Sequence, residues 1–76
     1  MDLSDRHPSV QKAARWLTPN PRLPQGAPAT VSAMFSDLRD RLLPVLGDGP
    51  QLVIALHHLT DAKDACERQA IEDSEG

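Results

Sequence analysis

Bulky side chains are scarce in this sequence. Its 76 residues include two aromatic ones, Trp16 and Phe35, and no tyrosine. Burial must therefore come from aliphatic side chains and alanine, which remove less surface from water per residue. A chain of this length is also near the size at which burial on folding barely offsets conformational entropy. We expect one thin core and a marginally stable monomer.

The usual covalent supports of a small domain are missing as well. The single cysteine, Cys66, cannot form an internal disulfide, a zinc quartet or a CxxC redox pair. Self-association is the remaining source of stability. The sequence therefore predicts a homo-oligomer.

Long hydrophobic runs are also absent. The longest apolar run, LVIAL at 52–56, is too short to span a bilayer. The first ten residues lack the apolar region of a signal peptide. We therefore expect a soluble, cytoplasmic protein without a membrane partner.

Charge is unevenly distributed along the chain. The net charge is −3, but residues 1–30 hold four basic and two acidic residues (+2), and residues 31–76 hold four basic and nine acidic ones (−5). An anion should prefer the first segment. Acidic residues in the last helix, such as Asp61 and Asp64, would repel DNA phosphates, so we expect no DNA binding.

Proline positions and apolar spacing predict a single all-α domain. The predicted bounds are a flexible N-terminus at 1–8, a short helix at 9–18 with Ser9 as its N-cap, and a proline-rich crossing loop at 19–28. An antiparallel helical hairpin follows at 29–72, with a frayed tail at 73–76. Pro44 should end the first hairpin helix at about Leu43, and Pro50 should open the second, capped by Asp48 or Gly49.

Apolar residues in the predicted hairpin recur every three or four positions. The expected seam comprises Val31, Phe35, Leu38, Leu42 and Val45, then Leu52, Ala55 or Leu56, Leu59, Ala62, Cys66 and Ala70. Two helices bury one seam and leave other apolar residues uncovered, among them Met34, Leu43, Val53 and Ile71. We expect further copies of the chain to cover these positions.

Metal and catalytic patterns are weak. His57 and Asp61 are one helical turn apart, but neighbouring His57 and His58 point about 100° apart and cannot share one ion, so we interpret them as exposed polar residues. Cys66 falls on the apolar stripe, which favours an inert core thiol. Acid pairs such as Asp37 with Asp40 lack any accompanying catalytic motif. We expect no catalysis, no metal and no cofactor.

The proline loop and the helix before it suit a small phosphorylated ligand. Lysine and arginine supply charge-assisted donors, a stiff backbone lowers the ordering cost of binding, and an indole can stack on a base. The alternatives are a loop that merely packs two helices together and a Trp16 that anchors the core. The candidate ligand-binding residues are Lys12, Arg15, Trp16, Thr18, Asn20, Pro21 and Arg22.

Two stretches, KAARWLTPNP at 12–21 and LHHLTDAKDACERQAI at 56–71, carry a family resemblance. The chain resembles the bacteriophage anti-CBASS sponge family over residues 10–71. The positions that match the family motif are Lys12, Ala13, Leu17, Thr18, Asn20 and Pro21, and more loosely Leu59, Ala62, Ala65, Cys66 and Ala70. Pro19 stands where an aromatic residue is common, so base stacking would fall to Trp16, an arginine or Phe35.

The resemblance implies a function. It implies helical subunits that assemble as interlocked dimers and then a hexamer, with pockets at subunit boundaries. These pockets would hold cyclic di- or trinucleotides without cleaving them, in the host bacterial cytoplasm, and so block CBASS-type antiphage defence. Two alternatives stay open: a helical-hairpin adaptor that binds another protein and no nucleotide, and an enzyme that consumes a cyclic nucleotide.

Overall fold

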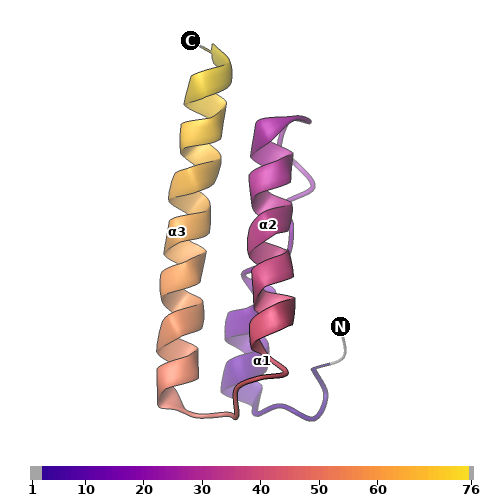
Figure 1. Ribbon diagram of the computed structural model, residues 1–76, viewed down its shortest axis with the longest axis vertical. Helices are drawn as coiled ribbons and strands as arrows, with labels where there is room; N and C mark the ends of the chain where they lie inside the picture. Colours follow the sequence, from indigo (N-terminus) through magenta and orange to yellow (C-terminus); the bar gives the residue numbers. More distant parts are fainter. Residues whose placement is uncertain (1–2, 76) are drawn as a thin grey trace.

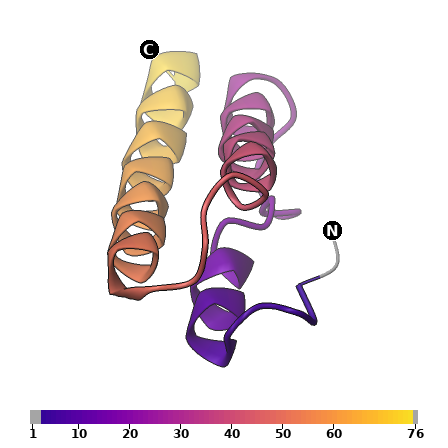
Figure 2. The ribbon, with the colours of Figure 1, turned by 60° about the horizontal axis from the view of Figure 1, so that its bottom comes forward.

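The computed structural model describes residues 3–75, and this range holds three helices and no strand. Helix α1 spans Pro8–Arg15, α2 spans Ala27–Leu42 and α3 spans Pro50–Glu75. In Figures 1 and 2, α2 and α3 lie side by side along the long axis, and α1 packs near the end where α2 leads into α3. The all-α prediction is confirmed.

Helix α1 begins earlier than predicted. Pro8 occupies its first turn, where the missing N–H costs nothing and the fixed φ suits a helix, so the N-cap is His7 rather than Ser9. His7 Nδ1 accepts a hydrogen bond of 3.1 Å from the Ser9 amide. The helix ends at Arg15 instead of residue 18, because Pro19 disfavours the α conformation at Thr18.

The loop between α1 and α2 covers residues 16–26, earlier in the chain than the predicted 19–28. Its backbone is held at Asn20, whose amide donates to Ser32 Oγ (2.9 Å) and whose Oδ1 accepts from the Arg22 amide (3.0 Å). Gly26 closes the loop with a φ of 98°, a value that side chains rarely tolerate. Helix α2 then starts at Ala27, two residues before the predicted start of the hairpin.

The prolines set the end of α2 and the start of α3 as predicted, whereas the end of α3 differs from the prediction. Pro44 ends α2 at Leu42, and α3 begins at Pro50. The tail was expected to fray from residue 73, but α3 continues to Glu75, where Ser74 Oγ donates to the Ala70 carbonyl. Residue 76 of the predicted tail lies outside the described residues.

The N-terminal segment is tied to the turn between α2 and α3. The Arg6 guanidinium donates to the Leu43 carbonyl (2.6 Å), to the Leu46 carbonyl (2.7 Å) and to Asp48 Oδ1 (2.6 Å). The last carbonyls of a helix lack intrahelical partners, and a cation satisfies them well. The predicted flexible N-terminus at 1–8 is therefore anchored at Arg6, and residues 1 and 2 lie outside the described range.

The hydrophobic core sits where all three helices meet. It is built from Val10, Ala13, Ala14, Leu17, Leu43, Leu52 and Leu56, with Leu3, Phe35, Val53 and Leu59 packed against it. In Figure 1 this is the lower half of the molecule. Leu43 and Val53, which were expected to need another copy of the chain, are thus covered within one chain.

The predicted seam is only partly right for α2, where Phe35 packs against the core as expected. The residues that α2 buries are Pro28, Ser32 and Ser36, whereas Leu38 and Val45 are 39% and 79% exposed. The serines lie one position round the helix from the predicted seam, so about 100° of rotation separates the two faces. Small side chains allow a closer helix contact, and α2 turns that small polar face inward.

The predicted seam is also wrong for the second half of α3. Burial continues from Leu56 to Lys63, Glu67 and Ala70, while Ala62 and Cys66 are exposed. Lys63 Nζ lies 2.9 Å from Glu67 Oε2, so each charge is compensated where it is buried. Ala62 and Cys66 were predicted to be buried because their side chains are apolar. Both are exposed, so the interpretation of Cys66 as a core thiol is wrong.

Candidate ligand-binding face

Helix α1 presents two cations and an indole on its outer side. Val10, Ala13 and Ala14 point into the core, which leaves Lys12 and Arg15 exposed on the opposite side. Trp16 follows directly and is 61% exposed. Lys12, Arg15 and Trp16 together line a shallow cavity of about 300 Å³. The alternative in which Trp16 anchors the core is therefore wrong.

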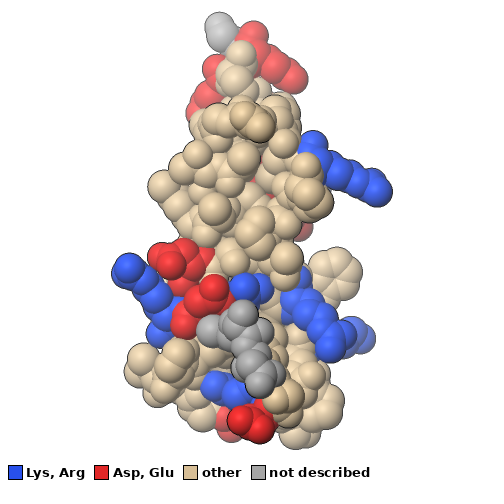
Figure 3. Space-filling view, turned by 90° about the vertical axis from the view of Figure 1, so that its right-hand side faces the viewer, with Lys and Arg blue, Asp and Glu red and all other residues tan. Residues whose placement is uncertain are grey.

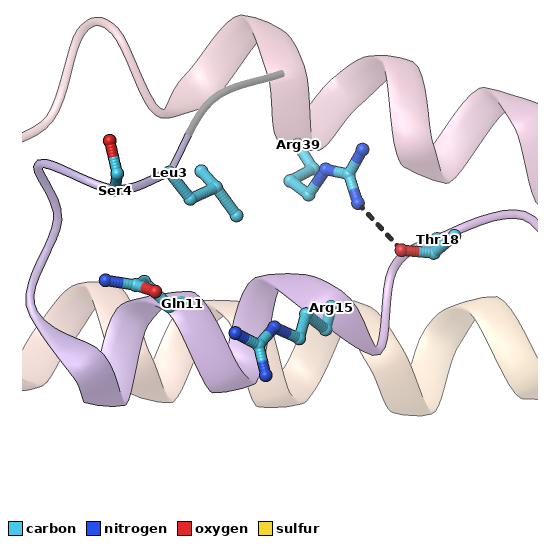
Figure 4. Close-up of a pocket in the computed structure, with 6 residues that line it drawn as sticks. All are labelled: Leu3, Ser4, Gln11, Arg15, Thr18 and Arg39. Carbon is cyan, nitrogen blue, oxygen red and sulfur yellow. Dashed lines mark hydrogen bonds between the residues drawn. The ribbon is translucent and has the colours of Figure 1, made fainter.

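A second, larger cavity adjoins the first. It has a volume of about 470 Å³ and is lined by Leu3, Ser4, Gln11, Arg15, Thr18 and Arg39. Figure 4 shows these residues around one hollow between the N-terminal segment, α1 and α2. Arg15 lines both cavities, so a ligand at the Trp16 indole and one in the larger cavity would share its guanidinium.

Arg39 was missed by the sequence analysis, yet it holds this site in place. Its side chain is 11% exposed and donates to the Ala14 carbonyl (3.1 Å), Thr18 Oγ1 (3.3 Å) and Ser36 Oγ (3.0 Å), as well as pairing with Asp40 (2.8 Å). The bond to Ala14 satisfies a carbonyl at the end of α1. A contact across 25 residues leaves no local pattern, so no signal in the sequence could have found it.

Unpaired positive charge gathers at α1 and the loop after it. Arg6, Arg39, Arg41 and Lys63 each have an acidic partner. The cations without an ion pair in the described part of the chain are Lys12, Arg15, Arg22 and Arg68, three of them in the predicted ligand segment. In Figure 3, blue side chains are mixed with red ones in the lower half of the face shown, and further red ones gather at the upper tip.

The structure divides the predicted ligand residues into two groups. Lys12, Arg15, Trp16 and Thr18 line the two adjoining cavities. Asn20, Pro21 and Arg22 are exposed in the loop and line neither of them. The Asn20 side chain is already engaged by the Arg22 amide at 3.0 Å, so its role is to shape the loop.

The residues considered for metal binding are separate exposed side chains. His57, His58, Asp61 and Cys66 all face solvent. Among residues 3–75, no three His, Cys, Asp or Glu side chains lie close enough together to hold a metal ion. We call the residues that line the two adjoining cavities the α1 face. It offers cationic donors, hydroxyl and amide groups and an aromatic surface, a set suited to binding a small phosphorylated ligand.

Comparisons of the chain with protein-family models, curated proteins and solved structures find no match. None of the helices described has the length and apolar character needed to cross a membrane.

Proposed function

We propose that the α1 face binds a cyclic di- or trinucleotide and holds it without chemical change, so that the protein acts as a sponge for this messenger in CBASS-type antiphage defence. One observation carries the proposal: an exposed indole, Trp16, lines one shallow cavity with two cations, Lys12 and Arg15, that make no ion pair within residues 3–75. Unpaired cations beside an exposed aromatic ring match the two chemical parts of a nucleotide.

Each part of the ligand has a suitable counterpart. Lys12 and Arg15 would donate charge-assisted hydrogen bonds to phosphate oxygens. The Trp16 ring would stack on a base, a contact worth about 1–3 kcal/mol per base. Gln11 and Thr18 line the larger cavity and would meet ribose hydroxyls or a second phosphate.

A cyclic ligand is favoured over a linear one. Cyclisation fixes the distance between phosphates and bases, so less conformational entropy is lost on binding. The resemblance to the sponge family points to the same class of ligand through Lys12, Thr18, Asn20 and Pro21. Both arguments favour sequestration in a host bacterial cytoplasm over catalysis.

The site is open to solvent on one side, and we propose that neighbouring subunits close it. The subunit would be the antiparallel hairpin of α2 and α3 with α1 packed against it. Copies of this unit would form dimers and then the hexamer that the resemblance implies. Enclosure would exclude water from the phosphates and strengthen their contacts with Arg15.

Titration calorimetry with cyclic di- and trinucleotides tests the proposal. We expect Arg15→Ala and Lys12→Ala each to weaken binding at least about tenfold, because a lost hydrogen bond to a charged group costs about 1.5–3 kcal/mol. Trp16→Ala should weaken binding to a similar degree. The matched control is Arg68→Ala, which removes an unpaired cation from α3 and should leave affinity unchanged.

Two results would contradict the proposal. If no cyclic nucleotide binds, or if Arg68→Ala weakens binding as much as Arg15→Ala, the α1 face is not the site. Heating the complex and recovering the nucleotide intact would distinguish a sponge from an enzyme. Loss of the nucleotide during incubation would show that the protein consumes it.

A second candidate is an adaptor that binds another protein. It is favoured by a mostly apolar groove of about 390 Å³ at the turn between α2 and α3, formed by Leu46, Gly47, Gly49, Pro50, Gln51, Leu52 and Ala55. Such a protein would bind its partner without any cyclic nucleotide. Substituting Leu46 by a polar residue would then abolish partner binding, whereas the sponge would retain its ligand.

A further inference from the structure

Helix α2 and the turn after it carry a row of four apolar residues and one arginine. The row consists of Val31, which is partly buried, and of Met34, Leu38, Arg41 and Val45, which are exposed, spaced three and four residues apart as in a heptad repeat. Met34 is 61%, Leu38 39% and Val45 79% exposed. We call these five residues the α2 stripe. Its spacing is that of a helix seam with nothing packed on it in the single chain.

The stripe is exposed because of the way α2 packs on its own chain. The helix buries Ser32 and Ser36, two small polar residues, and leaves Met34 and Leu38 outside. The Asn20 amide donates to Ser32 Oγ, and Arg39 of α2 donates to the Ala14 carbonyl at the end of α1, so these two bonds to the rest of the chain fix the rotation of the helix. The rotation therefore cannot relax to bury Met34 and Leu38 without breaking those bonds.

We propose that a second copy of this chain covers the α2 stripe, with the two α2 helices antiparallel about a two-fold axis. An axis between Leu38 and Arg41 would place Met34 opposite Val45 of the second copy and Leu38 against the aliphatic stem of Arg41. Such an isologous contact uses the same surface on both copies. It turns a solvated apolar seam into a buried one.

Charge complementarity favours an identical partner. Asp37 flanks the stripe one helical turn before Arg41, which belongs to it, and the two side chains are 3.3 Å apart and both largely exposed. The two-fold axis brings Asp37 of each copy within reach of Arg41 of the other. The surface thus carries both halves of its own ion pair, which a partner of unrelated sequence would have to supply independently.

The surface area of the chain is consistent with such a contact. The accessible surface is 5220 Å² for 8.3 kDa, which exceeds the value of about 4,600 Å² typical of a folded monomer of this mass. The excess of about 600 Å² approaches the roughly 800 Å² that each partner buries in a standard interface.

This inference rests on the self-association part of the proposed function and names its surface, but it requires no nucleotide. Sedimentation or light scattering of the ligand-free chain therefore tests it separately. We expect the wild type to be at least dimeric at micromolar concentration, and a Met34→Glu/Leu38→Glu variant to shift to a single copy. The control Ile54→Glu changes an exposed residue of α3 and should remain associated.

Circular dichroism checks that each variant keeps its helices. A single-copy wild type at 100 µM would overturn the inference, as would dissociation by Ile54→Glu with the Met34/Leu38 variant still associated. Loss of nucleotide binding in an intact dimer would instead contradict the ligand site alone.

A mixing experiment tests the charge pairing directly. The Asp37→Arg chain carries two cations beside the stripe, and the Arg41→Glu chain carries two acids. Each should associate with itself at least tenfold more weakly than the wild type, and a mixture should form mixed dimers well above the statistical half, as counted by native mass spectrometry. Mixed dimers at the statistical proportion would show that the pair acts within one helix only and would overturn the two-fold arrangement.

Discussion

The two ends of the contact between α2 and α3 are held together by opposite chemistry. Near the turn, Leu43, Leu52 and Leu56 form an apolar core with α1. Toward the start of α2 and the end of α3, the buried residues are small or charged: Pro28, Ser32, Ser36, Lys63, Glu67 and Ala70. Figure 1 shows one continuous pair of helices across both ends. We call the end near the turn the lower end and the opposite end the upper end. The chemistry changes between them because α1 covers only the lower end.

The comparison shows how a chain poor in bulky residues distributes its stability. Where three helices meet, leucines lose most of their surface to one another, and burial of each is worth about 1.5–3 kcal/mol. Where two helices meet, no third element excludes water, and a same-helix ion pair with two serines fills the contact. Glu67 Oε2 makes no aligned hydrogen bond within the described residues, so its compensation is the nearby Lys63 ammonium. The upper end should thus contribute more to selecting one arrangement of the two helices than to the free energy of unfolding.

Leu56→Ala should produce the largest effect. Leu56 is fully buried among three helices, and truncation should lower the free energy of unfolding by about 3–5 kcal/mol. The whole free energy of unfolding of a domain this small is little larger than this loss, so the variant should be largely unfolded at 25 °C. Urea denaturation followed by circular dichroism measures the change. Ile54→Ala, an exposed neighbour, should shift stability by less than about 0.5 kcal/mol, and equal losses would show that the lower core is not the main support.

Substitutions at Lys63 and Glu67 should reveal how the upper end works. Lys63→Met alone leaves a buried carboxylate without its cation and should cost about 3 kcal/mol. Replacing both residues, as Lys63→Met with Glu67→Leu, should restore or exceed wild-type stability. The midpoints of thermal unfolding of the two variants and the wild type give the comparison. A double variant as unstable as the single one would mean that the ion pair itself stabilises this end.

The smallest effect should be the pH dependence of the lower end. Hydrogen bonding from the His7 amide, and then from the Arg6 guanidinium, lowers the pKa of Asp48 below its usual value. A carboxylate with a lowered pKa stabilises the fold above its unfolded pKa, near 4, and loses that contribution as the pH falls through its folded pKa. The wild type should therefore be more stable than Asp48→Asn at pH 7, with the difference disappearing toward pH 2. A difference that persists at pH 2 would mean that Asp48 acts through packing.

The sequence predicted those features that depend on local chemistry. Prolines 44 and 50 located the end of α2 and the start of α3, because a proline ring acts on the adjacent turn of its own chain. The amphipathic pattern of α1 placed Lys12 and Arg15 outside. Features that depend on distant residues were missed. Arg39, whose partner Ala14 is 25 residues away, and the anchoring of Arg6 to the α2 carbonyls belong to this group.

The sequence by itself determined that the chain is helical and where the turn between α2 and α3 lies. It also determined that a segment of net positive charge precedes one of net negative charge. The tertiary structure alone decided which face of α2 turns inward and which of the predicted ligand residues share a cavity. Helix formation is a property of neighbouring residues, whereas rotation about the helix axis depends on what the rest of the chain brings against it. Here the bond from the Asn20 amide to Ser32 and the bond from Arg39 of α2 to the Ala14 carbonyl hold the serine face of α2 inward, and the apolar stripe is left outside as a consequence.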